Sequence, residues 1–385
     1  MIYFDSAATS AVSPAALEGF ERAVRDYGNP SSLHAMGDGA ARLMKDCRAS
    51  LKAAFRSRDE RDAVIFTASG SEANNLALMG TARAKEHFKG GRIIISNTEH
   101  PSVENCARAL ENEGFCVIRL STRGGAVSED ELLSSITKDT FLISLMTVNN
   151  ETGAVYDIPG LCRIAKAKNP DIIFHTDAVQ AFGKLDIPLV SAGVDLISAS
   201  AHKIGGFKGV GALYVSERIK RQKSLSCVIY GGGQEDGYRS GTENTPGIAS
   251  FAYAANERCS DIEKNLAHVT GLWSYVKEGA QNIGIKANTA PCPSPYILSL
   301  TLPGIKSNVM LNYLSSRGIC ISSGSACSSH HPNISSALTA FGLSGTDADC
   351  TVRISFSPTN TQEEAKALIC ALEEGVKRLI RMRKR

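Results

Sequence analysis

The fold is decided by two stretches of sequence, IIFHTDAVQ at residues 172–180 and VDLISASAHK at residues 194–203. Each stretch starts with an apolar, largely β-branched run, which predicts a buried strand. Each run then gives way to polar residues, among them Asp177 and Lys203. We therefore expect the ends of two neighbouring strands to bring a carboxylate and an amine close together.

Similar apolar runs alternate with amphipathic segments from about residue 60 to residue 215. The expected strands are Val64–Thr67, Arg92–Ser96, Cys116–Leu120, Phe141–Val148, Ile172–Thr176, Val194–Ala199 and Val210–Val215. Helical patterns such as Glu72–Phe88 and Ser128–Thr137 separate them. This alternation predicts an α/β fold with a seven-stranded, mostly parallel sheet between helices.

The pattern changes after about residue 247, where helices dominate and strands become few. A long helical region covers Gly247–Ile283, and Tyr296–Leu302 and Val352–Ser357 are the clearest later strands. We therefore expect a large domain at 13–250. A smaller α+β domain is expected from 1–12 and 251–385, and it carries a mobile cysteine loop at about 322–334.

Composition excludes several classes of protein. Of the 385 residues, 43% are hydrophobic and 21% charged, and the net charge of +3 is too small to indicate a nucleic-acid-binding protein. The basic segment 377–385 fits a solvated helix end, although a contact with RNA or an acidic protein stays open. The longest apolar run, Phe141–Val148, is too short to span a bilayer.

The cysteines indicate a reducing compartment. There are 11, scattered and without a C-x-x-C pair, which argues against a disulfide framework and a structural zinc site. Residues 1–5 already read as structured chain rather than as a signal peptide. We expect a cytoplasmic protein that binds no metal, no membrane and no nucleic acid directly.

A candidate anion site lies at TASGSEANN, residues 67–75, which follows a strand and opens a helix. Small residues such as Gly70 let backbone N–H groups approach an anion, and a helix N-terminus favours negative charge. Ser71 adds a hydroxyl donor. The alternative is an ordinary turn with Ser71 as the helix N-cap. Because no Walker motif is present, a nucleoside triphosphate is not the expected ligand.

Asp177 and Lys203 together match the needs of a pyridoxal 5'-phosphate (PLP) enzyme, in which a lysine binds the aldehyde and a carboxylate holds the ring nitrogen. Gln180 is close enough in sequence to donate to the ring oxygen. His100 and Asn150 each follow another expected strand, where ligands bind in α/β sheets. The alternatives are an exposed loop lysine, an aspartate N-cap and an Asn-rich turn.

Cys327 is a candidate nucleophile because its segment SSGSACSSHHP, residues 322–332, is small, polar and without periodicity. An incidental surface cysteine and a metal site with His330 and His331 remain as alternatives. The other ten cysteines mostly lie in periodic segments and are expected in the core. Arg353, on an alternating strand, either clamps a substrate carboxylate or faces outward.

These residues together resemble the cysteine desulfurases of the NifS/IscS type, which are fold-type I PLP enzymes of the class V aminotransferase superfamily. The resemblance covers nearly the whole chain. Its motifs are YFDSAAT (3–9), NPSSLH (29–34), EANN (72–75), EHPS (99–102), VNNETG (148–153), HTDAVQ (175–180), SAHK (200–203), GGGQE (231–235), RSGTEN (239–244), SGSACS (323–328) and RIS (353–355).

The resemblance implies a role for each matching residue. Lys203 binds PLP covalently, Asp177 binds its ring nitrogen and Gln180 its ring oxygen, while His100 and Asn150 flank the ring and the substrate. The phosphate-binding residues are Gly70, Ser71, Ser200 and His202, with Thr242 from the other subunit of a homodimer. Relatives usually have Thr where this chain has Ser71, a change that keeps the hydroxyl and at most alters affinity.

The implied activity is the conversion of L-cysteine to L-alanine, with Lys203, His100 and Cys327 as catalytic residues. Arg353, together with Asn29 and Asn150, binds the substrate, and Cys327 takes the sulfur as a persulfide. The sulfur then goes to an acceptor protein, such as an iron–sulfur scaffold or an enzyme of tRNA or cofactor thiolation. The rivals are a PLP lyase acting on selenocysteine or cystine, a class V aminotransferase, and a silent scaffold protein on the same fold.

Overall fold

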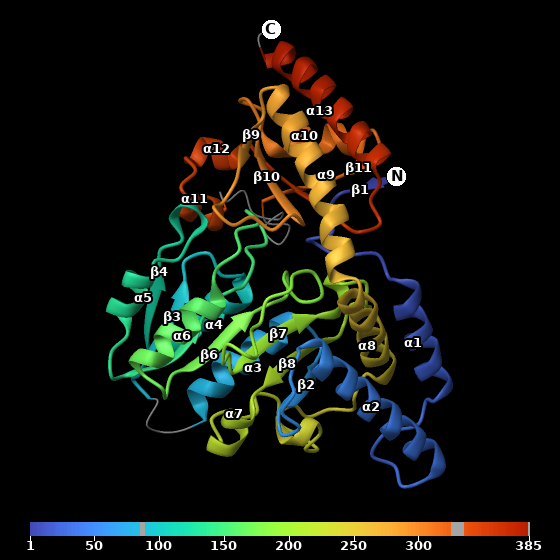
Figure 1. Cartoon of the computed structure of the whole chain (residues 1–385), viewed down its shortest axis with the longest axis vertical. Coiled ribbons are helices and arrows are strands. Elements are labelled where there is room, and N and C mark those ends of the chain that lie inside the picture. The colour runs from blue at the N-terminus through green and yellow to red at the C-terminus, as the bar shows by residue number, and fades with distance from the viewer. Residues whose placement is uncertain (85–88, 325–334, 384–385) are drawn as a thin grey trace.

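The structure is a computed structural model that describes residues 1–84, 89–324 and 335–383, with side chains up to residue 380. Its centre is a seven-stranded sheet in the order β2-β8-β7-β6-β5-β3-β4 (Figure 1). Only β8 runs against its neighbours. The predicted seven-stranded, mostly parallel sheet is therefore confirmed. Its strands are β2 (Ala63–Thr67), β3 (Arg92–Ser96), β4 (Cys116–Leu120), β5 (Thr140–Ser144), β6 (Ile173–Asp177), β7 (Leu196–Ser200) and β8 (Gly211–Val215).

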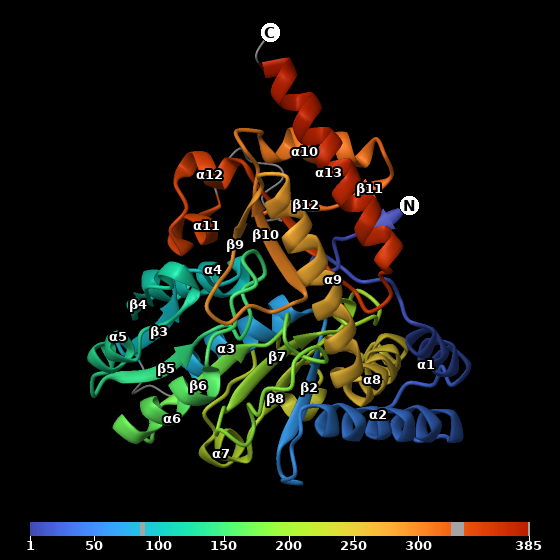
Figure 2. The same cartoon turned by 45° about the horizontal axis from the view of Figure 1, so that its top comes forward.

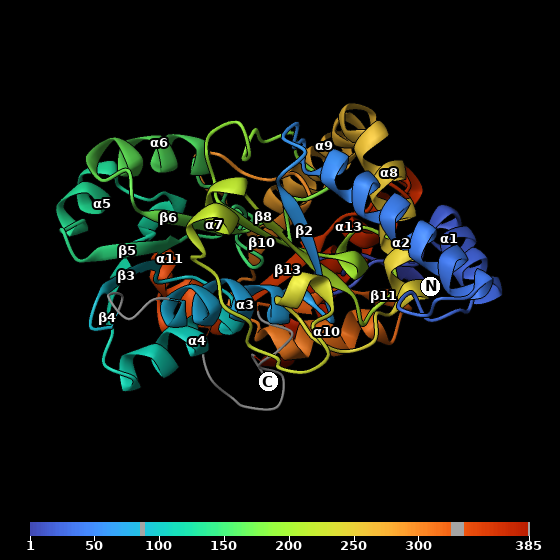
Figure 3. The same cartoon turned by 90° about the horizontal axis from the view of Figure 1, so that it is seen from below.

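Helices cover both faces of this sheet, as its largely buried strands require (Figure 3). One face packs against α3 (Gly70–Arg83) and α4 (Pro101–Asn112), through residues such as Leu76 and Leu110. The opposite face packs against α5 (Glu129–Ser135), α6 (Ile158–Lys168), α2 (Ala35–Ala54) and α8 (Thr245–Ser260). Shorter or peripheral helices are α1 (Pro14–Arg25) and α7 (Glu217–Gln222).

A second layer lies above the strand ends (Figures 1 and 2). Its antiparallel sheet has the order β12-β13-β10-β9, and a separate pair joins β1 to β11 in parallel. The strands are β1 (Ile2–Tyr3), β9 (Lys286–Asn288), β10 (Ile297–Thr301), β11 (Ile319–Cys320), β12 (Ser322–Ser323) and β13 (Thr351–Ser355). The helices are α9 (Ile262–Asn282), α10 (Ser307–Ser315), α11 (Ser336–Phe341), α12 (Gly345–Asp349) and α13 (Gln362–Arg383).

Most strand boundaries differ from the sequence prediction by one or two residues, and two differences are larger. The expected strand Phe141–Val148 is shorter in the structure, where β5 ends at Ser144. The backbone N–H groups of Leu145 and Thr147 still donate to carbonyls of β6, while Met146 and Val148 line a cavity. The expected helical region Gly247–Ile283 breaks at Asp261, which separates α8 from α9. In the described part of the chain, none of the helices combines the length and apolar character needed to cross a bilayer.

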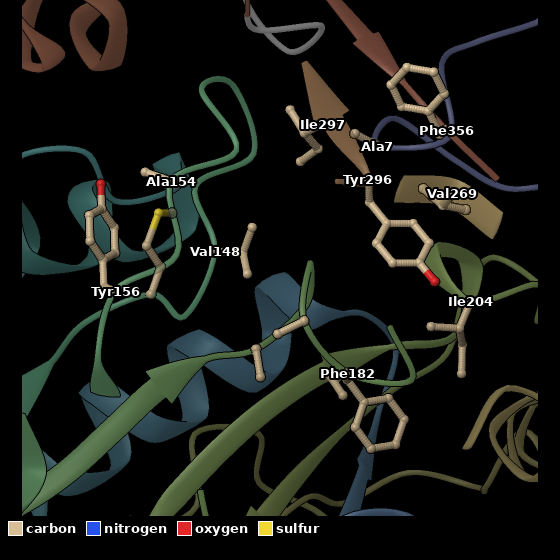
Figure 4. Close-up of a cluster of buried hydrophobic side chains, with 14 of the residues drawn as sticks. Ala7, Val148, Ala154, Tyr156, Phe182, Ile204, Val269, Tyr296, Ile297 and Phe356 are labelled. Carbon is tan, nitrogen blue, oxygen red and sulfur yellow. The ribbon is translucent and has the colours of Figure 1, made fainter. Parts of the chain in front are cut away.

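A hydrophobic cluster joins the two layers (Figure 4). Ala7 from the N-terminal segment, Phe182 and Ile204 from the sheet's connections, and Tyr296 beside β10 are all buried there. Hydrogen bonds from Gln180 to the carbonyl of Ala7 and from Ser10 to the carbonyl of His202 also attach the N-terminal segment to the connections after β6 and β7.

The prediction that most cysteines are core residues is wrong. Of the ten within the described residues, four are buried, and Cys116 and Cys370 are among the exposed ones. Cys116 opens the edge strand β4, and Cys370 lies on an exposed side of α13. Periodicity identified the elements but not which side of each element faces solvent.

Candidate active site

Ten of the predicted site residues line one cavity of about 310 Å³ at the ends of the parallel strands. That volume falls within the range of small-molecule sites. The ten are Gly70, Ser71, His100, Asn150, Asp177, Gln180, Ser200, His202, Lys203 and Arg353. The remaining lining residues are Ala7, Ala8, Ser69, Asn74, Ser102, Met146, Val148 and Val179.

Lys203 lies in a single helical turn directly after β7, and Asp177 is the last residue of the adjacent strand β6. The ammonium of Lys203 donates to the carbonyl oxygens of Ala7 at 2.6 Å and Ala8 at 2.8 Å. The alternative of an exposed loop lysine is therefore wrong. The N-terminal segment holds the amine at the cavity wall.

Asp177 anchors a chain of hydrogen bonds that crosses the cavity wall. Its carboxylate accepts from the side chain of Asn74 at 2.7 Å and from the backbone N–H of Val179 at 2.9 Å. The Asn74 amide also donates to the hydroxyl of Ser102 at 2.9 Å, and Ser102 contacts His100 Nδ1 at 2.8 Å. Asp177, Asn74, Ser102 and His100 thus form one polar network.

The network fixes the tautomer of His100, which caps α4. The backbone N–H of Ser102 donates to His100 Nδ1 at 3.2 Å, so that nitrogen is an acceptor and a neutral ring carries its proton on Nε2. Burial lowers the pKa of His100; Asp177 opposes this shift and Lys203 adds to it. His100 is therefore neutral near pH 7 and suited to proton transfer.

The N-terminus of α3 forms one end of the cavity. Its N-cap is Ser69, whose hydroxyl accepts from the backbone N–H of Glu72 at 3.1 Å, so the alternative that Ser71 caps the helix is wrong. A Cβ on Gly70 would lie 2.7 Å from Val179 Cγ2, which means that only glycine fits without displacement. The helix therefore presents its first N–H groups to the cavity without a side chain in front.

Two further polar groups face this end. The hydroxyl of Ser200 is buried and has no hydrogen-bond partner among the described residues. His202 Nδ1 contacts the hydroxyl of Thr9 at 3.2 Å, and burial, reinforced by Lys203, lowers the pKa of His202 to about 4. A buried donor without an acceptor costs stability. This end of the cavity is therefore complementary to an acceptor-rich anion such as a phosphate group.

Arg353 on β13 approaches from the second layer and is buried, so the alternative of an outward-facing arginine is wrong. Its guanidinium donates to the carbonyl of Asn150 at 2.8 Å and to the carboxylate of Asp5 at 3.0 Å. Its Nε has no partner among the described residues. Arg353 thus retains capacity to bind a second carboxylate.

Three predicted residues lie elsewhere. Asn29 is exposed, does not line the cavity, and its side chain accepts from the backbone N–H of Ser31. Thr242 is also exposed and does not line the cavity, although the ion pair of Arg239 with Glu72 at 2.8 Å holds its loop beside α3. Cys327 lies outside the described residues, as do both histidines of the alternative metal site.

The sequence reasoning gave no role to Asn74, Ser102 or Asp5. In the sequence, Asn74 stands out as a polar residue among the small apolar residues of a buried helix. Nothing in the sequence indicates that its partner is Asp177. A larger cleft of about 890 Å³ lies at the opposite, amino-terminal ends of the strands, near Lys89 and Lys168. It contains none of the predicted site residues. Among the described residues, no cluster of His, Cys, Asp and Glu side chains is suited to hold a metal ion.

Comparison with known proteins agrees with this geometry. The profile of the family "Aminotransferase class-V" matches residues 2–368. The chain belongs to the class V aminotransferase family. This family comprises PLP enzymes. A "NifS/IcsS protein homolog" of Lactobacillus delbrueckii is 39% identical over 97% of this chain and 97% of its own length.

A "Cysteine desulfurase IscS" of Clostridium botulinum is 35% identical over 98% of this chain and 94% of its own length. Among solved structures, a "NIFS-LIKE PROTEIN" superposes with a TM-score of 0.90 at 33% identity, covering 97% of this chain and 98% of its own. The likeness therefore extends over both layers, and the fold is that of this class V aminotransferase group.

Proposed function

We propose that this protein is a PLP-dependent cysteine desulfurase, which converts L-cysteine to L-alanine and transfers the sulfur to Cys327 as a persulfide. The relative from C. botulinum that carries this name matches 98% of the chain. The observation that carries the proposal is the placement of Lys203 and Asp177 around one cavity with an arginine beside them. A lysine, a carboxylate and a carboxylate-binding arginine are the groups that PLP chemistry on an amino acid requires.

The cavity fits the cofactor. Lys203 would bind its aldehyde, Asp177 its ring nitrogen and Gln180 its ring oxygen. The phosphate-binding groups would be Gly70, Ser71, Ser200 and His202, and the unpartnered Ser200 hydroxyl supports this assignment because it lacks an acceptor. When bound, PLP withdraws electrons from the Cα of an amino acid and so makes its α-proton acidic.

The residues of the chain would then position the substrate and move protons. Arg353 would bind the substrate carboxylate with Asn150 beside it, and the amine of Lys203 would remove the proton from Cα. His100, neutral near pH 7, would move protons through its Nε2. The thiolate of Cys327 would attack the substrate sulfur, so that an S–S bond forms while the Cβ–S bond breaks. The remaining three-carbon fragment gains protons and leaves as alanine.

The surroundings of this site are also proposals. We propose a homodimer in which Thr242 reaches the phosphate of the other subunit, since Thr242 is exposed and does not line its own cavity. The exposed apolar residues Leu33 and Tyr230 support such an interface. We also propose two domains, one at 13–250 and one formed by 1–12 together with 251–385. The pairing of β1 with β11 supports the second domain, because it joins the N-terminal residues to the C-terminal part of the chain. Asn29, which does not line the cavity of its own chain, would bind the substrate only after a rearrangement or in the partner's site.

The persulfide would pass to an acceptor protein, for iron–sulfur cluster assembly or for tRNA or cofactor thiolation. Such transfer needs a reducing compartment, and we propose the cytoplasm. The exposed free thiols of Cys116, Cys292 and Cys370 support this location, because exposed thiols oxidise in an oxidising environment.

The proposal is tested with two variants and one control. Lys203→Ala should lose the visible absorbance of the bound cofactor and all alanine production. Cys327→Ser should keep that absorbance but form no persulfide, whereas the control Cys320→Ser should retain both. Alanine production by Lys203→Ala would contradict the proposal. A keto-acid product would indicate an aminotransferase, and rapid sulfide release by Cys327→Ser would indicate a lyase.

A further inference from the structure

Lys184 is a buried lysine immediately behind the cavity, although it does not line it. Its side chain is 7% exposed, which is rare for lysine, and its ammonium lies 5.8 Å from the centre of the Tyr296 ring. The charged groups that influence it, Lys203, Arg258 and Arg353, are all cations. Burial and these cations lower the pKa of Lys184 to about 7. Such an unfavourable placement calls for a function.

The one acceptor recorded for Lys184 within the described residues is Gln180 Oε1, at 3.0 Å. The other atom of that amide, Nε2, donates to the carbonyl of Ala7 at 3.0 Å. The same carbonyl accepts from the ammonium of Lys203 at 2.6 Å. A continuous path of three hydrogen bonds therefore runs from Lys184 through Gln180 and Ala7 to Lys203.

This path determines which way the Gln180 amide points. If the amide were reversed, its NH₂ group would face the Lys184 amine, and its oxygen would face the Ala7 carbonyl. The contact with Ala7 would become acceptor–acceptor, and the contact with Lys184 would become donor–donor whenever its amine is protonated. With the observed orientation, Nε2 uses one N–H for Ala7 and keeps a second N–H, and Gln180 is one of the residues that line the cavity.

We propose that Lys184 is a positioning residue that fixes the Gln180 amide so that it presents an N–H donor, rather than a carbonyl, to the ring oxygen of the cofactor. This inference rests on the proposed binding of PLP and adds a residue to that site. With PLP bound to Lys203, this donor would compete for the ring oxygen with the proton that this oxygen shares with the bound nitrogen. Lys184, by holding the donor in place, would make that proton easier to lose.

The test is a pH titration of the visible absorbance of the PLP-loaded full-length protein. Lys184→Met keeps the length and apolar stem of the side chain but removes its amine. We expect its absorbance midpoint to lie about one pH unit above that of the wild-type protein, which is a tenfold change in proton affinity. Affinity for PLP, measured by fluorescence titration, should fall about threefold to tenfold. An unchanged midpoint in a folded variant overturns the proposal.

Two controls separate the possible causes. Lys166 is a partly buried lysine that does not line the cavity, and its ammonium lies 2.7 Å from the Asp195 carboxylate. Lys166→Met should leave the midpoint unchanged. Lys184→Met is then repeated in a Gln180→Leu background, where the shift should largely disappear. An equal shift in both backgrounds means that Lys184 acts through space, and the proposal is wrong. A wild-type protein without any PLP absorbance refutes the proposed function instead.

Discussion

Replacing Asn74 by aspartate tests the network around Asp177. The Asn74 amide lies 2.7 Å from the Asp177 carboxylate, and the variant puts a second carboxylate there. Two ionised groups at this distance repel by about 6 kcal/mol at an effective dielectric constant of 20. Protonating one aspartate of ordinary pKa costs less, about 4 kcal/mol at pH 7 and about 1.5 kcal/mol at pH 5. The folded variant should therefore hold one shared proton across the pair.

Because the pKa of this pair is raised in the folded state only, the variant is destabilised most at high pH and recovers as the pH falls. We expect Asn74→Asp to be less stable than the wild-type protein by about 4 kcal/mol at pH 7 and by about 1.5 kcal/mol at pH 5. Urea unfolding of full-length protein stripped of cofactor measures both differences. The control Asn75→Asp adds the same charge to the same helix, away from Asp177. Equal losses at both pH values, or an equal loss in the control, would refute the reasoning.

Three further predictions concern single side chains. Burial lowers the pKa of His175 to about 3, so below pH 6.5 the unfolded chain binds a proton that the folded protein does not. The free energy of unfolding should therefore fall with pH, by about 2 kcal/mol at pH 5. His175→Gln should flatten this dependence in urea unfolding. Gly70→Ala should weaken PLP binding about tenfold in fluorescence titrations because its Cβ meets Val179, while Gly39→Ala, with open space around it, should not. Ser200→Ala should weaken PLP binding yet leave the cofactor-free protein as stable or about 1 kcal/mol more stable by thermal unfolding, since it removes an unpartnered hydroxyl.

The sheet was predictable because its strands are short apolar runs, of which all but the edge strand β4 are largely buried. All seven expected runs became strands, and β3 and β4 kept their predicted bounds. The run at Phe141–Val148 was overestimated, since residues that line a cavity are as apolar as residues that pair in a sheet. Periodicity and composition cannot separate these two causes of burial.

The site was predictable where a functional residue directly follows a strand, as Lys203 and Asp177 do. It was not predictable where a residue acts through a partner distant in sequence. Asn74 contacts Asp177 across 103 positions, and Lys184 gave no signal beyond a lysine after a small-residue turn. Asn29 is the opposite case: a motif located it, one chain does not bring it to the cavity, and its role stays a prediction.

The N-terminal segment at residues 5–9 has a consequence for the order in which the protein is made. Its carbonyl at Ala7 holds Lys203, 196 positions later, and its Asp5 pairs with Arg353, 348 positions later. During synthesis these early residues must therefore wait for almost the whole chain to leave the ribosome. A chain interrupted before Arg353 leaves Asp5 without its cation and the cavity without one wall. The cavity is consequently completed only after the chain has been made through Arg353.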